Sequence, residues 1–268
     1  TLLSNYNVTY NNGALTIGKA ALTVTGVNRT LTYNGAAQTN SGASYSGQIG
    51  SESFTISGYG SGTNASLTPY ADNLSVTEGS GTLLSNYNVT YNNGALTIGK
   101  AALTVTGVNS TVTYNAATQT NSGATYTGNV AGESFTISGY GSALHVGTYA
   151  DSLSVAAGSN TSLSNYNVTY VNGGLTINKA LLGISVASTY NGTTTIAPAS
   201  ATLTGLVGTD SAASITQLTI NSKDVASASY VTGFLLSNFN NGNYELNTSA
   251  NTTLGQNTTN TVVLSAKA

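Results

Sequence analysis

An internal repeat constrains this chain more than any other feature of its sequence. The first 28 residues, TLLSNYNVTYNNGALTIGKAALTVTGVN, recur without a single change at 82–109. A third copy of the motif, SNYNVTYVNGGLTINKA, covers 164–180, and a weaker echo, LSNFNNGNYEL, covers 236–246. Self-similarity at a fixed period is typical of arrays of one small structural unit, so we expect tandem domains rather than one large fold.

The dipeptide Lys-Ala marks the period of the repeat, with spacings of 81, 79 and 88 residues between Lys19, Lys100, Lys179 and Lys267. These spacings divide the chain into the end of one repeat (1–18) and three full repeats, here called repeat 1 (19–99), repeat 2 (100–178) and repeat 3 (179–268). Residues 1–18 match the final hairpin of a repeat. We expect them either to dock through Tyr6 and Tyr10 on the repeat that follows or to mark a truncation point, because a lone two-stranded hairpin is marginally stable.

Apolar and polar residues alternate along the repeat, for example over Leu22–Thr25, Phe54–Ser57, Leu74–Thr77 and Tyr87–Tyr91. Alternation with a period of two places successive side chains on opposite faces of a strand. The residue types, mainly Thr, Val, Ile and Tyr, also favour strands. The sequence therefore predicts an all-β fold with six or seven short strands per repeat, arranged as tandem small β-sandwich or β-grasp-like domains.

Asn-Gly dipeptides follow or separate several of the alternating segments. Asn-Gly is the strongest short-range signal for a two-residue hairpin, because a type I′ turn needs positive φ at both central residues. We expect such turns at Asn12-Gly13, Asn34-Gly35, Asn93-Gly94 and Asn172-Gly173.

The junctions between repeats contain almost no linker. Around Lys100 the chain reads ALTIGKAALTV, so the last strand of one repeat passes directly into the first strand of the next. Short connections restrict hinge motion, and each compact 80-residue domain has a radius of gyration of about 12 Å. The sequence therefore predicts an elongated, stiff rod, spanning roughly 100 Å for three such domains.

Composition excludes several function classes. Only 5% of residues are charged and the net charge is −2, so we expect neither nucleic-acid binding nor attraction to a membrane surface. No apolar run approaches 18 residues, so we expect no membrane insertion. The absence of Cys excludes disulfides and thiolate chemistry. The hydrophobic share of 40% is still sufficient for a core.

The repeat resembles the MBG-type repeats of large secreted bacterial adhesins. The residues that carry this resemblance are SNYNVTYNNGALTIGKAALTV, GESFTISGYG and GTYADSLSV. Repeat 3, with TYNGT, KDV and NYEL, resembles the sister YDG-type repeat instead. Two departures are Asn191, where that family usually has Asp, and Ala116, where repeat 1 has Gly35. The resemblance implies an extracellular, stalk-like or matrix role at the bacterial cell surface, and it brings no catalytic residues or cofactor.

Few side chains are candidates for chemistry. The lone His145 lacks the neighbours of a metal site, and we interpret it as a loop residue. A glycosidase needs a close carboxylate pair, for which only Glu52 with Asp72 and Glu133 with Asp151 qualify. The Ser-Gly-Tyr-Gly segments at 57–60 and 138–141 lack the Lys of a phosphate loop and are expected to be turns. We predict no catalytic, cofactor-binding or metal site.

Recurring tyrosines occupy two positions, the first at Tyr6, Tyr87, Tyr166 and Phe239 and the second at Tyr10, Tyr91 and Tyr170. Their alternation with valine favours core aromatics over a sugar-stacking platform, whereas the non-repeating Tyr230 is freer to be exposed. The junction lysines are interpreted as capping residues rather than isopeptide cross-links. Asn-x-Ser/Thr sequons leave glycosylation open at Asn7, Asn28, Asn64, Asn73, Asn88, Asn167 and Asn191.

The favoured hypothesis is a non-catalytic spacer in an extracellular adhesin involved in adhesion or biofilm matrix, whose partners are other repeats of the same protein. Near-identity of successive repeats supports a spacer, because a spacer needs copies. The first alternative is a module that binds glycan or polysaccharide, which would gain from repetition. The second is a fibre subunit, because nearly uncharged strands lack the Lys and Pro that protect sheet edges. Ice binding through flat threonine arrays and enzymatic activity are ranked below these.

Overall fold

The computed structural model describes residues 1–198, 201–229, 231–237, 241–246 and 262–265. Tyr230, Phe239 and Lys267, which the sequence singled out, lie outside the described residues. The chain forms two compact units: the first holds 1–102, 129–133 and 162–167, and the second holds 103–128, 134–161 and 168–268. The first unit therefore contains residues 1–18 and repeat 1 together with three short segments of repeat 2.

Repeat 1 has ten strands, several of them only two residues long. The strands are β1 (Ala20–Thr25), β2 (Arg29–Thr32), β3 (Gln38–Thr39), β4 (Ser44–Ser46), β5 (Phe54–Ser57), β6 (Ser61–Gly62), β7 (Tyr70–Ala71), β8 (Ser75–Glu78), β9 (Tyr87–Asn92) and β10 (Ala95–Gly99). A 3-10 turn, η2 (Leu84–Asn86), precedes β9. The sequence predicted six or seven strands, and the surplus comes from two-residue strands too short to show alternation.

Parallel pairing of distant strands organises repeat 1. β9 pairs with β1, from Ala20↔Tyr87 to Thr25↔Asn92, and β10 pairs with β2 at the same offset. The sheets are ordered β4-β1-β9 and β2-β10-β7, with two-stranded sheets β3-β6 and β5-β8. The partners of β9 and β10 are thus more than sixty residues away, at the opposite end of the repeat.

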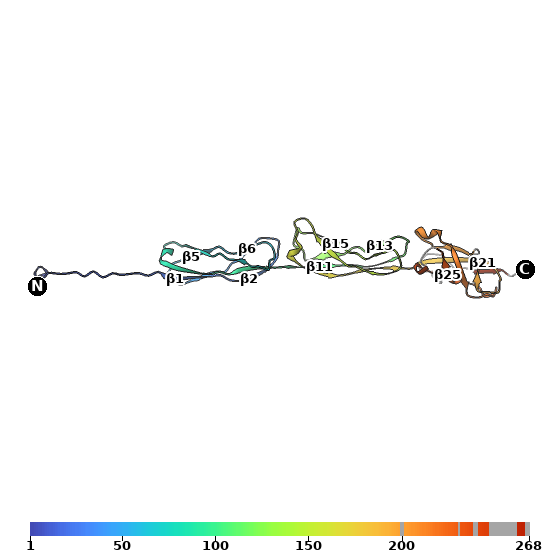
Figure 1. The fold of residues 1–268 in the computed structure, drawn as a ribbon, viewed down its shortest axis with the longest axis horizontal. Coiled ribbons are helices and arrows are strands. Elements are labelled where there is room, and N and C mark those ends of the chain that lie inside the picture. The colour runs from blue at the N-terminus through green and yellow to red at the C-terminus, as the bar shows by residue number, and fades with distance from the viewer. Residues whose placement is uncertain (199–200, 230, 238–240, 247–261, 266–268) are drawn as a thin grey trace. The chain divides into compact units, whose positions relative to one another are not determined.

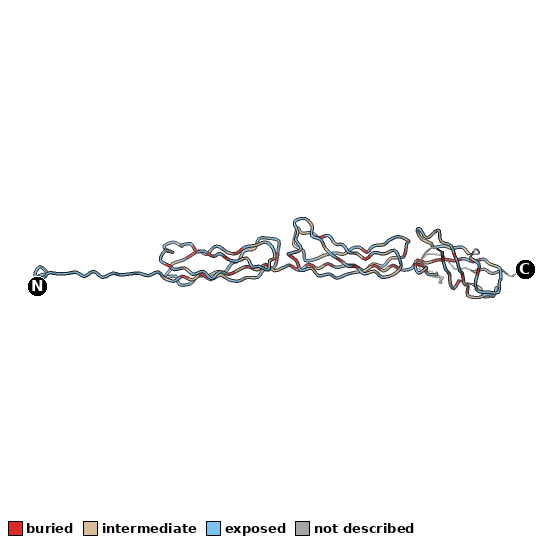
Figure 2. The backbone as a smooth tube through the Cα atoms, viewed as in Figure 1, coloured by how far each residue is buried: buried red, intermediate tan, exposed pale blue. Residues whose placement is uncertain are grey.

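The core of repeat 1 lies between two β layers. Leu22 and Val24 of β1 and Tyr87 of β9 pack with Phe54 of β5 and Val76 of β8. Figure 1 shows β5 and β6 facing β1 and β2, and Figure 2 shows buried residues recurring along these strands. The alternating burial of β1 and β10 explains why the period-two pattern was visible in the sequence.

The Asn-Gly hairpin prediction is wrong at Asn93-Gly94. β9 and β10 do not pair with each other but belong to different sheets. Gly94 is not among the residues with positive φ, and a Cβ at Gly94 would lie 2.4 Å from the carbonyl oxygen of Val27. Glycine is required here because two backbone segments approach closely: the link between β1 and β2 and the link between β9 and β10, each of which passes from one sheet to the other. The equivalent Gly173 meets the backbone of Val108 in the same way.

Repeat 2 has the same architecture and keeps the order of the sheets: β14-β11-β19, β12-β20-β17, β13-β16 and β15-β18. The strands are β11 (Ala101–Thr106), β12 (Asn109–Thr113), β13 (Gln119–Thr120), β14 (Thr125–Thr127), β15 (Phe135–Ser138), β16 (Ser142–Ala143), β17 (Gly147–Ala150), β18 (Ser154–Ala157), β19 (Tyr166–Val171) and β20 (Gly174–Asn178). The 3-10 turn η3 (Leu163–Asn165) precedes β19.

Repeat 3 differs in its first strand, which is long and unbroken. β21 pairs in parallel with β26 and β27 and antiparallel with β23, while β22-β24-β25 form a second sheet. The strands are β21 (Ala180–Thr189), β22 (Thr195–Ile196), β23 (Ala201–Thr204), β24 (Ile215–Ile220), β25 (Val231–Leu236), β26 (Tyr244–Leu246) and β27 (Val262–Ser265), with 3-10 turns η5 (Gly208–Ala212) and η6 (Asn241–Asn243). β21 thus corresponds to β1 and β2 combined, because it pairs in parallel with both β26 and β27.

The all-β prediction is confirmed: the described residues form strands and short 3-10 turns, without an α-helix. Each sheet lies wholly within one of the spans 20–99, 101–178 and 180–265. The first strand of each repeat begins at the Ala of the Lys-Ala dipeptide. The junction lysine is therefore the last residue before each new sheet begins.

The expectation that residues 1–18 dock on the following repeat through Tyr6 and Tyr10 is wrong. Apart from the 3-10 turn η1 (Leu3–Asn5) they form no regular structure, and Tyr6 and Tyr10 are 63% and 80% exposed. Chain connectivity explains this result. The equivalent β10 ends where β2 ends, whereas residue 18 is bound to the start of β1, so residues 1–18 cannot pair in that register with their own repeat.

Candidate functional site

One cluster of polar side chains recurs where one repeat meets the next. In the first unit the carboxylate of Glu133 accepts hydrogen bonds from the hydroxyls of Tyr33, in repeat 1, and Tyr166, in repeat 2. The two rings meet edge to face, with centroids 5.6 Å apart and an interplanar angle of 78°. Edge-to-face pairs of this kind are a favourable aromatic geometry. Two tyrosines from successive repeats thus share one carboxylate, and Tyr33 lies 100 positions from Glu133 in the sequence.

The same cluster occurs in the second unit, between repeats 2 and 3. Asp210 accepts hydrogen bonds of 2.8 Å from both Tyr114, in repeat 2, and Tyr244, in repeat 3. These rings also meet edge to face, 5.5 Å apart at 82°. The chemistry is therefore preserved even though aspartate replaces glutamate and repeat 3 differs in sequence.

Two local structures position these groups, and we name them here. The tyrosine turn is the Tyr-Asn-Gly or Tyr-Asn-Ala segment that follows β2, β12 or β21 (33–35, 114–116 and 190–192). The acceptor loop is the segment that ends in the carboxylate (48–52, 129–133 and 206–210).

In each tyrosine turn the Asn side chain accepts a hydrogen bond of 3.0 Å from the backbone N–H two residues later, as in Asx turns. The third residue has positive φ, at Gly35 (78°), Ala116 (60°) and Gly192 (78°). The backbone N–H groups of Tyr33 and Tyr114 bind the carbonyls of Gly99 and Asn178, the residues just before the junction lysines. The turn is therefore fixed to the end of its own repeat.

The acceptor loop makes the same two hydrogen bonds in all three repeats. The carboxylate residue donates its N–H to the carbonyl three residues earlier, at 3.1–3.2 Å. The N–H of that earlier residue, Ile49, Val130 or Val207, donates to the hydroxyl of the tyrosine that opens β9, β19 or β26. Each of these tyrosine hydroxyls therefore accepts one bond from the loop and donates another to its carboxylate.

A buried asparagine adds a second contact at each junction. Asn165 accepts from the N–H of Ala65 at 2.9 Å and donates to the side-chain oxygen of Asn64. Asn243 accepts from the N–H of Val146 and pairs with Nδ1 of His145 at 3.1 Å. His145 was predicted to be a loop residue, and it does lie in an exposed loop, but it also takes the place of Asn64 in this contact.

The carboxylates change the acid–base properties of the tyrosines. The hydrogen bond to Glu133 raises the pKa of Tyr33, and the bond to Glu52 raises the pKa of Tyr87. Burial, followed by the bond to Glu133, raises the pKa of Tyr166 to about 12. Burial and Asp210 raise the pKa of Tyr114 and Tyr244 in the same way. The tyrosines are therefore neutral donors at physiological pH.

A second carboxylate, which is buried, lies inside each of repeats 1 and 2. Both oxygens of Asp72 accept from the amide of Asn40 at 3.0 Å, and the N–H groups of Gly60 and Gly94 donate to them as well. Asp151 binds Asn121 and Gly141 equivalently. The carboxylates considered as possible glycosidase pairs have different partners: Glu52 and Glu133 bind tyrosines, and Asp72 and Asp151 bind amides.

The Ser-Gly-Tyr-Gly segment connects β5 to β6 in repeat 1 and β15 to β16 in repeat 2. Gly58 has φ of +85°, and Gly139 has the same value. A Cβ at Gly58 would lie 2.0 Å from the carbonyl oxygen of Asn73, so glycine is required. The N–H of Gly60 then points to the internal carboxylate of Asp72 rather than to an external anion.

The two recurring tyrosine positions have different environments. Tyr87 and Tyr166 are buried, as predicted, whereas Tyr91 and Tyr170 are 39% and 40% exposed. The second position is exposed because it lies near the end of β9 or β19, beyond the buried part of the strand. The structural equivalent of Tyr87 in repeat 3 is Tyr244 and not Phe239, because Ala180 pairs with Tyr244 as Ala20 pairs with Tyr87.

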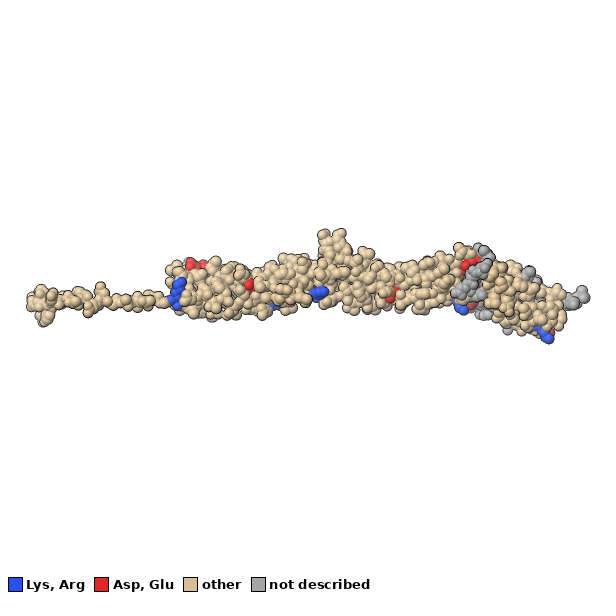
Figure 3. All heavy atoms as spheres, viewed as in Figure 1, with Lys and Arg blue, Asp and Glu red and all other residues tan. Residues whose placement is uncertain are grey.

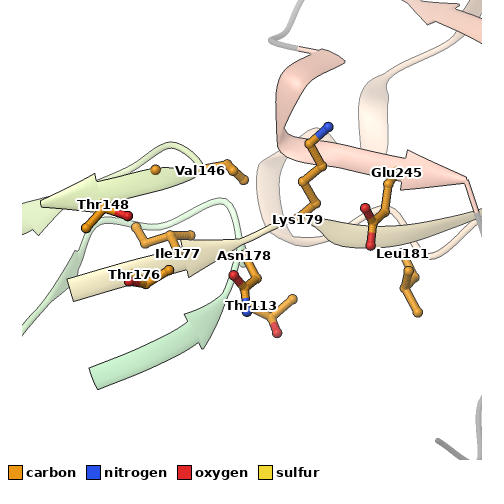
Figure 4. A pocket seen from close by; sticks show the side chains of 10 residues that line it. Thr113, Val146, Thr148, Thr176, Ile177, Asn178, Lys179, Leu181 and Glu245 are labelled. Carbon is orange, nitrogen blue, oxygen red and sulfur yellow. The ribbon is translucent and has the colours of Figure 1, made fainter. Parts of the chain in front are cut away.

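An open pocket of about 710 Å³ lies in the second unit, and its lining includes Thr113 and Glu245, the sequence neighbours of Tyr114 and Tyr244. Figure 4 shows Thr113, Thr148 and Thr176 on neighbouring strands, with Lys179 and Glu245 farther along. Its walls are mainly threonine and aliphatic side chains. A shallow surface with few charged groups is suited to weak polar contacts.

Charged side chains are sparse on the face drawn in Figure 3. Lys19, Lys100 and Lys179 are exposed, and so are the seven sequon asparagines named above. Within the described ranges, no three His, Asp or Glu side chains are grouped so that they could hold a metal ion. The only helical elements among the described residues are short 3-10 turns, and none is long and apolar enough to cross a membrane.

Comparisons with protein-family models, with curated proteins and with solved structures gave no match to this chain.

Sequence reasoning missed the carboxylate–tyrosine cluster because its members are about a hundred residues apart. A signal was nevertheless present. Glu52, Glu133 and Asp210 end loops of similar sequence, and a Tyr-Asn pair recurs at 33, 114 and 190. A sparse carboxylate kept at one place in every repeat indicates a structural partner that is also repeated.

Proposed function

We propose that this chain is a non-catalytic stalk segment of an extracellular bacterial adhesin. The observation that carries the proposal is the recurrence of one carboxylate–tyrosine cluster at two successive junctions. The cluster joins the tyrosine turn of one repeat to the acceptor loop of the next. Its hydrogen bonds connect repeats to each other, which is what a load-bearing spacer requires.

Two further features support the proposal. The chain passes through Lys100 and Lys179 from one sheet to the next without a linker, which limits hinge motion. The resemblance to MBG-type and YDG-type repeats, together with the absence of Cys, supports a secreted bacterial protein. Attachment to a cell surface and a role in adhesion or biofilm matrix are parts of this proposal.

Distance measurements between spin labels test the proposal. Because the chain has no Cys, single cysteines can be placed at the exposed, equivalent positions Asn73 and Ser152 without other changes. We expect a narrow distance distribution, which broadens when Tyr33→Phe and Glu133→Ala remove the cluster. A label pair within repeat 1, at Thr30 and Asn73, is the control and should not change. A distribution that is broad in the unmodified chain would contradict a stiff stalk.

A second candidate function is weak binding of glycans, favoured by the exposure of Tyr91 and Tyr170 at equivalent positions. Exposed aromatic rings repeated along a chain could stack on successive sugars, and repetition would raise the avidity. Titration of soluble polysaccharides into the chain and into the Tyr91→Ala, Tyr170→Ala double variant tests this. Equal heats for both proteins would exclude these rings as the binding platform.

A further inference from the structure

The pocket in the second unit lies where repeat 2 ends and repeat 3 begins, and all of its lining belongs to that unit. Its volume of about 710 Å³ is in the range of small-molecule sites. The lining comes from β12, β17 and β20 on one side and from the start of β21 and from β26 on the other (Figure 4). Its polar side chains are Thr113, Thr148, Thr176, Asn178, Lys179 and Glu245.

The strand register explains why the uncharged polar groups gather here. Thr148 lies directly opposite Thr176, and Thr113 is paired with Asn178. Thr176 and Asn178 are two residues apart in β20 and occupy its less buried positions. Directly paired residues, and residues two apart in one strand, emerge from the same face of a sheet. Three hydroxyls and one amide are therefore presented together on the outward face.

Two charged groups complete the lining on the side of repeat 3. Lys179 is the single residue between β20 and β21, and Glu245 is paired with Leu181 across β21 and β26. Both charged side chains are exposed. One ammonium and one carboxylate leave the pocket with no net formal charge.

The polar side chains of the pocket have no partners in the part of the chain that the structure describes: none of the six forms a hydrogen bond or an ion pair there. Directly opposed hydroxyls elsewhere in repeat 2 do bond to each other, at 3.0 Å for Ser138 with Ser154 and 2.8 Å for Thr120 with Ser142. Thr148, opposite its own partner threonine, makes no such bond. The pocket hydroxyls are therefore available to a ligand.

The junction between repeats 1 and 2 carries other residues at several of these positions. Pro69, Gly99, Ala102 and Asn167 stand where the pocket has Thr148, Asn178, Leu181 and Glu245. Both junctions keep the carboxylate–tyrosine cluster, so the cluster does not explain these differences. Thr148 and Asn178 moreover belong to repeat 2, which has the same architecture as repeat 1. The pocket groups are thus additions to a junction that is otherwise repeated.

We propose that this pocket binds a neutral oligosaccharide, at a site separate from Tyr91 and Tyr170. Sugar hydroxyls both donate and accept hydrogen bonds, which matches a lining that contains hydroxyl, amide, ammonium and carboxylate groups. The carboxylate of Glu245 accepts from a sugar hydroxyl, and the ammonium of Lys179 donates to one. The C–H groups of the sugar rings pack against the aliphatic side chains of the lining, which are Val146, Ile177 and Leu181.

Charge and size disfavour other ligand classes. A phosphate or sulfate group would meet one cation, Lys179, and would be repelled by the carboxylate of Glu245. A zwitterion such as a free amino acid would satisfy both charges but leave the threonine hydroxyls unused. Because the pocket is open and much of the ligand stays in water, we expect a dissociation constant on the order of 1 mM.

Saturation-transfer NMR on the full chain tests the proposal. The probes are the neutral tetrasaccharides cellotetraose, mannotetraose and maltotetraose, with tetragalacturonate as the acidic comparison. Saturation of the protein methyl groups should pass to the ring protons of at least one neutral probe. Raising the salt concentration should leave its affinity unchanged, because a neutral ligand is not subject to ionic screening.

Variants locate the binding site. Thr148→Val and Thr176→Val keep the side-chain shape and remove a hydroxyl, and Lys179→Met keeps the aliphatic stem and removes the charge. Each should weaken binding by about threefold to tenfold, the effect of one lost hydrogen bond. Thr97→Val and Lys100→Met, at the equivalent positions of repeat 1, are the matched controls and should bind normally. Urea midpoints equal to that of the unmodified chain show that the variants are folded.

Three outcomes would overturn the proposal: no saturation transfer to any neutral probe at concentrations up to about 10 mM, full binding by the three pocket variants, or salt-sensitive binding of tetragalacturonate alone. Binding that is lost in the Tyr91→Ala, Tyr170→Ala variant and kept in the pocket variants would assign the sugar to those rings instead. The stalk proposal is independent of all these results, because the spin-label distances test it separately.

Discussion

Residues 1–18 and residues 82–99 have the same sequence and different structures. In the second copy Tyr87, Leu96 and Ile98 are buried in β9 and β10, whereas in the first copy the identical Tyr6, Leu15 and Ile17 are exposed. Local propensity is equal in the two copies, so it cannot be the cause. The difference is a partner: β9 and β10 pair in parallel with β1 and β2, and residues 1–18 have no such strands within reach. The formation of strands by this sequence therefore depends on partner strands that are distant in the chain.

The largest expected effect comes from truncating the same leucine in both copies. Leu96 is fully buried and Leu15 is 87% exposed. We expect Leu96→Ala to lower the free energy of unfolding by about 2–5 kcal/mol, through lost burial and a residual cavity. Leu15→Ala should change it by less than about 0.5 kcal/mol. Urea unfolding followed by circular dichroism measures both, and equal effects would show that the first copy is also packed.

Glycine substitutions test whether the backbone is closely packed in residues 82–99 and open in residues 1–18. A Cβ at Gly94 would lie 2.4 Å from the backbone of Val27, whereas a Cβ at Gly13 would meet nothing within 4 Å. We expect Gly94→Ala to cost about 2–3 kcal/mol, because packed backbones must separate. Gly13→Ala should be neutral in the same thermal or urea melt. A tolerated Gly94→Ala would mean that the step between sheets is looser than described here.

Removing the carboxylate of an acceptor loop compares a loop that binds tyrosines from two repeats with a loop that binds a tyrosine from one. Glu133 binds two tyrosine hydroxyls and Glu52 binds one. Each partly buried hydroxyl left without an acceptor costs about 1–3 kcal/mol. We therefore expect Glu133→Ala to destabilise the chain more than Glu52→Ala, by roughly the contribution of one such hydroxyl. Similar midpoints for the two variants in urea would contradict a role for Tyr33 in the junction.

The smallest effect is expected from pH. The raised pKa values favour neutral tyrosine in the folded chain, so this stabilisation is complete below the ordinary tyrosine pKa of about 10. It is lost as the pH rises through the folded pKa of about 12 for Tyr166. Absorbance titration should show the Tyr166 transition near pH 12, and Glu133→Gln should lower it. A Tyr166 transition that remains at pH 10 would contradict the cluster.

Much of the fold was predictable because strands with one buried face alternate visibly, as β1, β5, β9 and β10 do. The wrong predictions share one cause, because each concerns a residue whose environment is set by a strand distant in the sequence. Asn93-Gly94 has the sequence of a hairpin turn, but its glycine is needed because the backbone of Val27 lies against it. Phe239 matches Tyr87 in the aligned sequence, but the strand register pairs Ala180 with Tyr244. The carboxylate–tyrosine cluster was invisible for the same reason, although its repeated residues were all present.

We propose that the carboxylate–tyrosine clusters hold successive repeats in a stiff, extended arrangement. Small-angle X-ray scattering of the full chain, extrapolated to zero concentration, tests it most directly. We expect a monomer with a maximum dimension of roughly 100 Å or more, as three compact domains in line require. A compact monomer, in which the repeats fold back on each other, would contradict the claim.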